Sequence, residues 1–290
     1  MMFPKGMSSF VQFLKFIYFQ RRNLLEDFKK QNELQNLITN ERIDTFFQPI
    51  ISLTTGCTIG VECLNRPALS EQFPSTESFY DYIGKSKDIF SVEQLLRNLS
   101  IKRFSEQIRT NKPFKEHLIF LNILPQVLSD PNFRSSFTSE LLQKYQISPY
   151  QIVLELTEKE AVDSVAHFDQ LVDHYRDQGF RIAVDDAGTG YNSLKTLAKV
   201  KPEFVKIDKC LIRKIDKHPE QQHLVELLLE FANHTDTSVI AEGIESKEEF
   251  TYIQSIGVHY GQGFAIGKPK ENLCPGHLPY ENEIYSERLG

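Results

Sequence analysis

Eight short apolar segments alternate with helix-like stretches along most of this chain, and this alternation limits the fold more than any other feature. The segments read FFQPIISL (46–53), CTIGVECL (57–64), HLIFLNIL (117–124), IVLELTE (152–158), RIAVDDAG (181–188), FVKIDK (204–209), TSVIAEGI (237–244) and GQGFAIG (261–267). Continuous apolar strands separated by helices are typical of parallel strands that are buried on both faces. Eight of them predict an α/β protein with a closed (β/α)8 TIM-like barrel rather than an open sheet.

The stretches between the segments have the periodicity of helices. Residues 165–178 place Phe168, Val172 and Tyr175 on one face and end at Gly179, a residue type that commonly follows the last turn of a helix. The start of the barrel is irregular. Residues 54–56 (Thr-Thr-Gly) predict a hairpin between the first two strands, whereas a regular barrel begins with strand, helix and strand.

Polar residues recur where these apolar segments end. Six lie toward the C-terminal end of their segment and the seventh lies early in the last one: Glu62, Asn122, Glu155, Asp185, Lys206, Glu242 and Gln262. A single acid at such a position is unremarkable, because Asp and Glu are common at helix N-termini. Their recurrence at nearly every strand end is different, since the C-terminal ends of barrel strands meet at one face, where active sites lie.

Four or five carboxylates on one small face repel each other unless cations neutralise them. Oxygen ligands without a matching set of His or Cys residues are typical of Mg²⁺ or Mn²⁺ rather than Zn²⁺. The sequence therefore predicts two divalent metal ions, Mg²⁺ or Mn²⁺, at this face. It contains no GxSxG nucleophile turn, no GxxxxGK[ST] loop and no dinucleotide-binding glycine pattern.

The net charge and the cysteines indicate which partners and which cellular compartment are compatible with this chain. The chain carries 33 Lys and Arg against 39 Asp and Glu, a formal net charge of −6, which argues against binding of duplex nucleic acid. The four cysteines show no CxxC spacing, which favours reduced thiols and a cytoplasmic location.

The N-terminal segment is open to several interpretations. The apolar run FVQFLKFIYF (10–19) is too short for a transmembrane helix, and no signal-peptide cleavage pattern follows it. Phe10, Ile17, Leu24 and Ile38 follow a seven-residue spacing, interrupted by Gln31, that is typical of a packed helix. We expect a helix that covers one end of the main domain, pairs with another helix, or lies on an anionic membrane surface.

Taken in order, the motifs resemble those of the EAL-domain phosphodiesterases that hydrolyse cyclic di-GMP. The naming motif is present as Glu62-Cys63-Leu64, followed by Asn65-Arg66-Pro67. The other signatures stand as QPI (48–50), LNIL (121–124), ELTE (155–158), DDAGTGYNSL (185–194), VKID (205–208), AEGIE (241–245) and GQGF (261–264). The resemblance covers roughly residues 43–270 and implies three regions: an N-terminal helical extension (1–40), an EAL-type barrel domain (41–275) and a polar C-terminal tail (276–290).

The resemblance also implies roles for individual residues. Metal ligands would be Glu62, Asn122, Glu155, Asp185, Asp186 and Glu242. Catalytic residues would be Glu62, Lys206 and Glu242, and Lys206 would orient the attacking water or help to deprotonate it. Substrate contacts would be Gln48, Leu64, Arg66 and Gln262, of which Arg66 would bind a phosphate and Gln262 would support the network of metal and water. Glu158 would anchor the loop after Asp186, a loop that in the family couples dimerisation to catalysis.

The function implied is a metal-dependent phosphodiesterase that hydrolyses cyclic di-GMP to linear pGpG by in-line attack of a metal-activated water, in a homodimer. Two positions depart from the family pattern. Cys63 replaces an alanine and is expected to point away from Glu62, and Ala187 replaces a phenylalanine next to the glycines of its loop. No acidic ligand is lost, yet the altered loop keeps open a second interpretation, a catalytically weak sensor or adapter that binds cyclic di-GMP.

Overall fold

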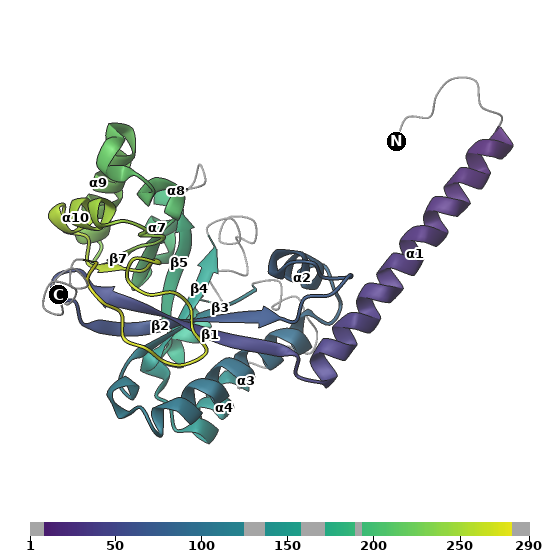
Figure 1. Ribbon diagram of the computed structural model, residues 1–290, viewed down its shortest axis with the longest axis horizontal. Helices are drawn as coiled ribbons and strands as arrows, with labels where there is room; N and C mark the ends of the chain where they lie inside the picture. The colour runs from purple at the N-terminus through teal and green to yellow at the C-terminus, as the bar shows by residue number, and fades with distance from the viewer. Residues whose placement is uncertain (1–8, 125–136, 158–171, 189–192, 280–290) are drawn as a thin grey trace, which may run out of the picture. The chain divides into compact units, whose positions relative to one another are not determined.

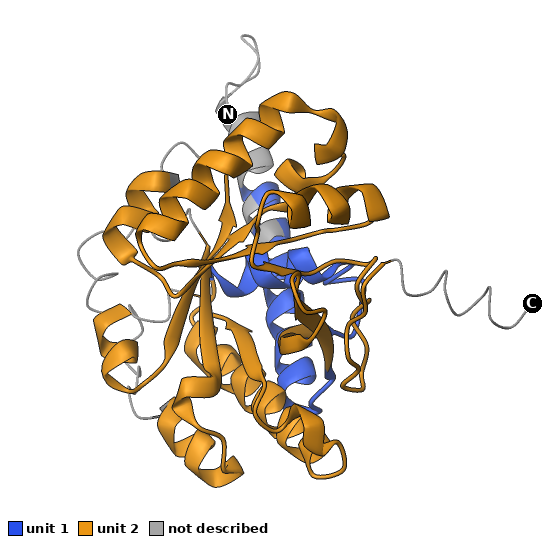
Figure 2. Ribbon diagram, turned by 90° about the vertical axis from the view of Figure 1, so that its left-hand side faces the viewer, with its two compact units in different colours: residues 1–44, 66–85 blue, residues 45–65, 86–290 orange. Residues whose placement is uncertain are grey.

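A computed structural model of the chain describes residues 9–124, 137–157, 172–188 and 193–279. The chain divides into two compact units (Figure 2). The first unit contains Met1–Asp44 and Arg66–Lys85, and the second contains Thr45–Asn65 and Ser86–Gly290.

The second unit contains a closed eight-stranded barrel (Figure 1), so the predicted fold class is confirmed. Neighbours in the barrel follow the order of the chain, from β1 to β8 and back to β1. The strands are β1 (Ile43–Ser52), β2 (Thr58–Pro67), β3 (Leu118–Asn122), β4 (Ile152–Thr157), β5 (Arg181–Ala187), β6 (Phe204–Ile207), β7 (Ser238–Ala241) and β8 (Tyr260–Gly261).

The irregular start of the barrel is also confirmed. Strand β1 is antiparallel to β8, whereas every pair from β2–β3 through β7–β8 is parallel. The turn between β1 and β2 is closed by a hydrogen bond from the Ser52 amide to the Cys57 carbonyl (2.9 Å). Gly56 in this turn has a φ of +72°, a conformation that glycine adopts without a steric penalty.

Helices connect the parallel strands. In the described parts of the second unit they are α3 (Ile89–Ile108), α4 (Phe137–Tyr145), α7 (Ser193–Val200), α8 (Lys209–Ile212), α9 (Pro219–His234) and α10 (Lys247–Ser255), with short 3-10 turns at Lys112–Phe114, Pro149–Gln151 and Ile215–Lys217. Helix α9 lies between β6 and β7, where the alternation of segments predicts a helix. The helix predicted at 165–178 lies partly outside the described residues, but Val172 and Tyr175 are buried and Gly179 has a φ of +88°.

Alternate residues of each strand face opposite sides of the barrel wall. One set forms a continuous core that includes Leu154, Val184 and Val205, together with Cys63, which thus lies on the face opposite Glu62 as expected. The other set forms a smaller cluster: Ile50, Phe120, Val153, Ala183, Phe204 and Ile240. A polar residue lies two positions from each member of this cluster, on the same side of its strand: Gln48, Asn122, Glu155, Asp185, Lys206 and Glu242. The barrel wall thus places a polar layer directly above an apolar one.

The first unit confirms the predicted N-terminal helix. It contains α1 (Ser9–Thr39) and α2 (Thr76–Ile83). The Tyr82 hydroxyl of α2 donates a hydrogen bond to Gln31 Oε1 of α1 (3.0 Å), and the rings of Phe73 and Phe79 make an edge-to-face contact. Among the described residues, no helix is both long and apolar enough to cross a membrane.

The segment after β8 is held to the barrel by backbone hydrogen bonds. Phe47 and Lys270 exchange two of them, and Gln107 of α3 contacts the backbone of Glu271 and Leu273. Further along, the Gly276 amide donates to Thr58 Oγ1 (3.0 Å). The start of the predicted polar tail is therefore fixed against the first hairpin, while residues 280–290 lie outside the described part of the chain.

Candidate active site

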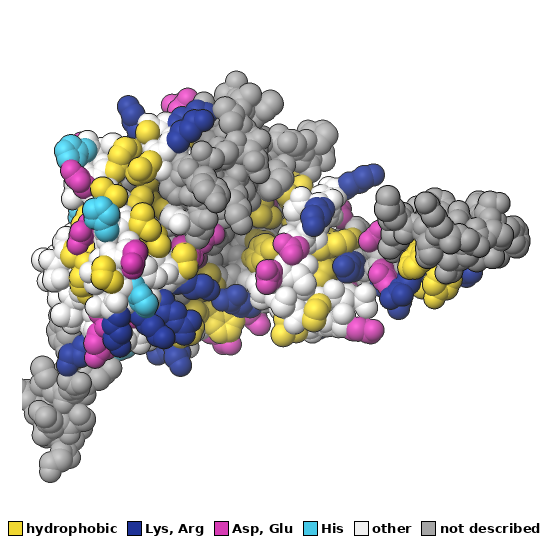
Figure 3. All heavy atoms as spheres, turned by 90° about the horizontal axis from the view of Figure 1, so that it is seen from above, with side chains coloured by type: hydrophobic (Ala, Val, Ile, Leu, Met, Phe, Trp, Pro, Cys, Tyr) yellow, Lys and Arg dark blue, Asp and Glu magenta, His cyan; other side chains and the backbone are white. Residues whose placement is uncertain are grey.

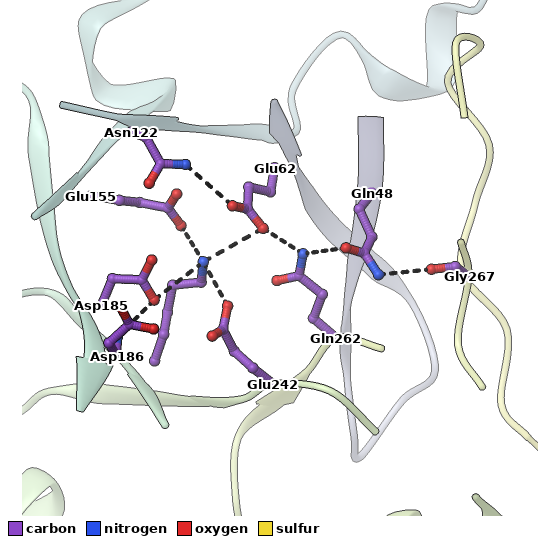
Figure 4. A network of polar contacts seen from close by, with 10 residues as sticks. Gln48, Glu62, Asn122, Glu155, Asp185, Asp186, Glu242, Gln262 and Gly267 are labelled. Atoms are coloured by element: carbon purple, nitrogen blue, oxygen red, sulfur yellow. Dashed lines mark hydrogen bonds and ion pairs between the residues drawn. The ribbon is translucent and has the colours of Figure 1, made fainter. Parts of the chain in front are cut away.

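Side chains from three strands, β2, β4 and β5, and from the segment after β7 meet around one buried ammonium group (Figure 4). Lys206, which is 1% exposed, extends from β6. Its Nζ atom lies 2.7 Å from Glu155 Oε1 and 2.7 Å from Glu242 Oε1. It lies 3.5 Å from Glu62 Oε2 and 3.6 Å from Asp185 Oδ1. The structure therefore brings together four of the predicted acids and the predicted lysine at one end of the barrel.

A chain of amide side chains fixes the orientation of Glu62. Gln262 Nε2 donates to Glu62 Oε2 (2.6 Å) and to Gln48 Oε1 (3.1 Å), and Gln48 Nε2 donates to the Gly267 carbonyl (3.1 Å). On the other side, Asn122 Nδ2 donates to Glu62 Oε1 (3.3 Å). Both oxygens of Glu62 are thus held, which leaves the carboxylate one orientation (Figure 4).

Strand β5 bends where its two aspartates lie. The register between β5 and β6 shifts between Val184 and Ala187, and Asp186 has a φ of +57°. A bulge of this kind re-aims a side chain, and a positive φ at a non-glycine residue is a strain typical of functional sites. As a result Asp185, Asp186 and Glu242 each offer a carboxylate oxygen within 4.8 Å of the others.

The four carboxyl groups around Lys206 have shifted pKa values, and the direction of the shift depends on burial, neighbouring charges and hydrogen bonds. Burial alone would raise the pKa of Glu62, but the Lys206 charge and the hydrogen bonds from Gln262 and Asn122 lower it below its ordinary value. The pKa of Glu155 is raised well above its ordinary value by burial, with Glu62 and Asp185 adding to the effect. Burial likewise raises the pKa of Asp185, and it raises that of Glu242 to about 8.

Lys206 is held in its charged form. Burial opposes the charge, but Asp185, Glu155, Glu242 and Glu62 together raise the pKa of Lys206 well above its ordinary value. A protonated ammonium group donates hydrogen bonds and has no lone pair. In this arrangement, with no cation beside the carboxylates, the protonated Lys206 donates to its neighbours and can orient them.

The donor set fits a divalent cation. One ammonium group cannot neutralise the four carboxylates that surround it. Both oxygens of Glu155 are buried and accept no hydrogen bond, although Oε1 is ion-paired with Lys206. Buried carboxylates whose pKa values are raised are ionised when a cation binds. The ligands are all oxygen atoms, as Mg²⁺ and Mn²⁺ prefer.

Three predicted site residues lie apart from this network. Leu64 is half-buried on β2, two residues after Glu62 and on the same side of the strand. Arg66 is exposed and belongs to the first unit, so its predicted contact with a phosphate stays a prediction. Glu158, the predicted loop anchor, lies outside the described residues.

Sequence reasoning missed Glu249, a buried carboxylate that organises the loop after β7. Its Oε2 atom accepts hydrogen bonds from the amides of Glu245 (2.8 Å) and Ser246 (3.0 Å), and its Oε1 atom accepts one from the Lys214 amide (2.7 Å). The Ser246 side chain caps α10 in return. The signal was readable as Ser246-Lys-Glu-Glu249, the spacing of a capping box.

The sequence matches one known protein family over most of its length. The model of the EAL domain family matches residues 31–269. The chain therefore belongs to the EAL domain family, as the order of its motifs predicted.

Individual proteins show the same similarity. The chain is 30% identical to an Escherichia coli protein, "Probable cyclic di-GMP phosphodiesterase PdeB", over 83% of its own length and 46% of that protein. It thus spans less than half of that relative. Among solved structures, a standalone EAL protein from Vibrio cholerae O395 with bound c-di-GMP is 29% identical, with a TM-score of 0.68, and the match covers 81% of this chain and 95% of that one. The EAL enzyme Bd1971, with bound cAMP and cyclic di-GMP, is 28% identical with a TM-score of 0.77, covering 91% of this chain and 74% of that one.

Proposed function

We propose that this protein is a metal-dependent phosphodiesterase that hydrolyses cyclic di-GMP to linear pGpG. The observation that carries the proposal is the ring of four carboxylates, those of Glu62, Glu155, Asp185 and Glu242, around the buried Lys206 at one end of the barrel. Membership of the EAL domain family and the named activity of its relatives support the choice of substrate. The cyclic di-GMP bound to the Vibrio cholerae protein supports it as well.

The cations would be Mg²⁺ or Mn²⁺. Six residues would hold them: Glu62, Asn122, Glu155, Asp185, Asp186 and Glu242. Two such ions, when bound, polarise a phosphodiester and make a water molecule acidic enough to attack it near neutral pH. The cluster Asp185, Asp186 and Glu242 supports a cation at the bend of β5, and Glu155 Oε2, which is buried and accepts no hydrogen bond, supports a second one.

The chain's own groups would bind and orient the reactants. Lys206, as a protonated donor, would hold the attacking water against the phosphorus atom. Gln262 and Gln48 would act on the reaction by fixing Glu62, because their hydrogen bonds run to its carboxylate. Leu64 would contact the substrate and Arg66 one of its phosphates, since both residues follow Glu62 closely on the chain.

Incubation of the purified protein with cyclic di-GMP and Mn²⁺ or Mg²⁺, followed by chromatography, tests the proposal. We expect many equivalents of pGpG per protein, none in EDTA and none from Glu62→Gln. The Glu26→Gln variant is the matched control, since Glu26 lies on exposed α1, and we expect it to turn over like the natural protein. Turnover that persists in EDTA contradicts the metal-dependent mechanism.

The second candidate function is a sensor that binds cyclic di-GMP without efficient turnover. The observation that favours it is Ala187, which is fully buried directly after the strained Asp186 and replaces a larger family residue. Tight binding measured by calorimetry, together with less than one turnover, would select the sensor over the enzyme. In that case Ala187→Phe is the variant to test for gain of activity.

A further inference from the structure

Helix α1 carries an exposed apolar stripe. Five large side chains within twelve residues are between 46% and 67% exposed: Ile17, Tyr18, Leu24, Leu25 and Phe28. At about 100° per residue, all five lie on one face of the helix, around Arg21. We call these five residues and Arg21 the α1 seam. Figure 3 shows hydrophobic side chains beside charged ones on this helix, at the right of the view.

The seam is distinct from the part of α1 that anchors the helix in the first unit. Leu34 and Leu37 are fully buried, and they lie on roughly the opposite face from the seam. Gln31 bonds to Tyr82 of α2 (3.0 Å), and Lys30 lies over the same ring (5.8 Å). The helix is thus fixed near its C-terminal end, and the seam occupies the turns before that anchor. Helices in proteins gain most of their stability by packing an apolar face, so burial of the seam would stabilise these turns.

The spacing of the seam favours another helix as its partner. Ile17, Leu24 and Phe28, with Arg21 between them, are separated by steps of four, three and four residues. This is the repeat by which two helices interlock side chains along a common axis. A flat sheet or a loop does not require that repeat.

The charged residues on and beside the seam indicate whether two copies of α1 would pair parallel or antiparallel. In a parallel, in-register pair each residue lies level with its own copy, so Arg21 would meet Arg21 inside an apolar seam. In an antiparallel pair centred between residues 22 and 23, Ile17 lies level with Phe28 of the other copy. Asp27 then lies about one helical turn along the axis from Arg21 of the other copy. Glu26 lies on the other side of α1 and pairs with Arg22 of its own helix (2.9 Å). The pair of opposite charges Arg21 and Asp27 therefore occurs twice in one symmetric contact.

We propose that the α1 seam pairs antiparallel with the same seam of a second copy of this chain. A membrane surface fits the seam less well. Arg21 would be buried among acyl chains, and Glu26 and Asp27 would face anionic headgroups of the same sign. The inference does not depend on the proposed activity.

Light scattering coupled to size-exclusion chromatography, over a series of concentrations, tests the pairing in the full chain. We expect the mass to rise from 33.6 kDa toward twice that value. The variant Leu24→Lys should weaken the dimer by at least about tenfold, because a charge at the centre of an interface removes its most buried contact. The matched control is Phe19→Lys, the same kind of change on the other face of the helix (43% exposed), which should leave the dimer intact.

Charge reversal tests the direction. Arg21→Glu and Asp27→Arg should each weaken the dimer, and the double variant should restore it, because only the antiparallel contact pairs these two positions. A chain that stays monomeric at every concentration, or a dimer that Leu24→Lys leaves unchanged, overturns the proposal. Flotation of a monomer with vesicles of anionic phospholipid, lost in Leu24→Lys, would overturn it in favour of a membrane surface.

Discussion

At the scale of single residues, the carboxylates of the site differ in whether their negative charge stabilises or destabilises the folded protein. Glu62 is held by Lys206 and by two amide side chains, so its charge is favourable in the fold. Glu155 is buried and Glu242 is half-buried beside other carboxylates, so their charges are unfavourable until a cation binds. The same ring therefore contains acids whose removal should have opposite effects on the folded protein without metal.

We predict that Glu155→Gln raises the melting temperature in EDTA, whereas Glu62→Gln lowers it. The first variant removes a buried charge that its neighbours oppose, and the second removes a charge that donors stabilise. Both variants should lose turnover. Thermal unfolding followed by circular dichroism measures the shifts, and equal shifts of the same sign would contradict the electrostatic account.

Glu242 makes a prediction about pH. Its pKa of about 8 in the folded protein lies above the ordinary value of 4.5, so the folded state binds more protons between these values than the unfolded state does. The contribution of Glu242 to stability therefore falls as pH rises through this window. In EDTA we expect the loss of unfolding free energy between pH 6 and pH 8 to be smaller in Glu242→Gln by about 2 kcal/mol. Urea unfolding at the two pH values measures it, and an unchanged difference would contradict the raised pKa.

At the scale of elements, the connections after the strands set the geometry of the site. Strand β5 ends in a bulge that turns Asp186, and the loop after β7 is organised by Glu249. Through the Lys214 amide, Glu249 also ties this loop to the turn that follows α8. The bulge in β5 positions Asp186, and the loop held by Glu249 positions Glu242, because each lies next to one of these residues.

We predict that Glu249→Ala lowers kcat more than it raises KM and destabilises the fold by about 2 kcal/mol, because three backbone amides lose their acceptor. Glu249→Gln keeps one acceptor oxygen and should recover part of both losses. The matched control is Glu248→Gln, an exposed neighbour on the same helix, which should change neither. Steady-state kinetics and urea unfolding give the two readouts. A variant that loses stability while keeping kcat and KM would assign Glu249 a structural role alone.

At the scale of the whole molecule, the barrel closes on itself with its polar layer at one end. Strands far apart in sequence supply that layer, so a cation bound there links β2 to β7 and should stabilise the entire second unit. With Mn²⁺ at about a hundred times its dissociation constant, we expect a gain in unfolding free energy of about 2.7 kcal/mol. Urea unfolding with and without Mn²⁺ measures this gain. The Asp185→Asn/Asp186→Asn double variant should show none, and an equal gain in that variant would place the cation elsewhere.

The sequence by itself determined the architecture, because burial imposes a readable pattern. Strands covered on both faces must be apolar throughout, so polar exceptions such as Glu155 and Lys206 mark the site in the sequence alone. The opening hairpin was equally readable from Thr54-Thr55-Gly56. The oxygen ligands predict Mg²⁺ or Mn²⁺, and both the ions and the residues that hold them stay a prediction.

Only the tertiary structure decided how these residues act on each other. Gln262 contacts Glu62 across 200 positions of sequence, and the capping spacing around Glu249 gave no hint that this side chain also binds the Lys214 amide. The positive φ of Asp186 has no sequence signature, since the bulge depends on how β5 meets β6. Patterns of burial are local and repeat along the chain, whereas contacts, strain and pKa values arise from groups that only the closed barrel brings together.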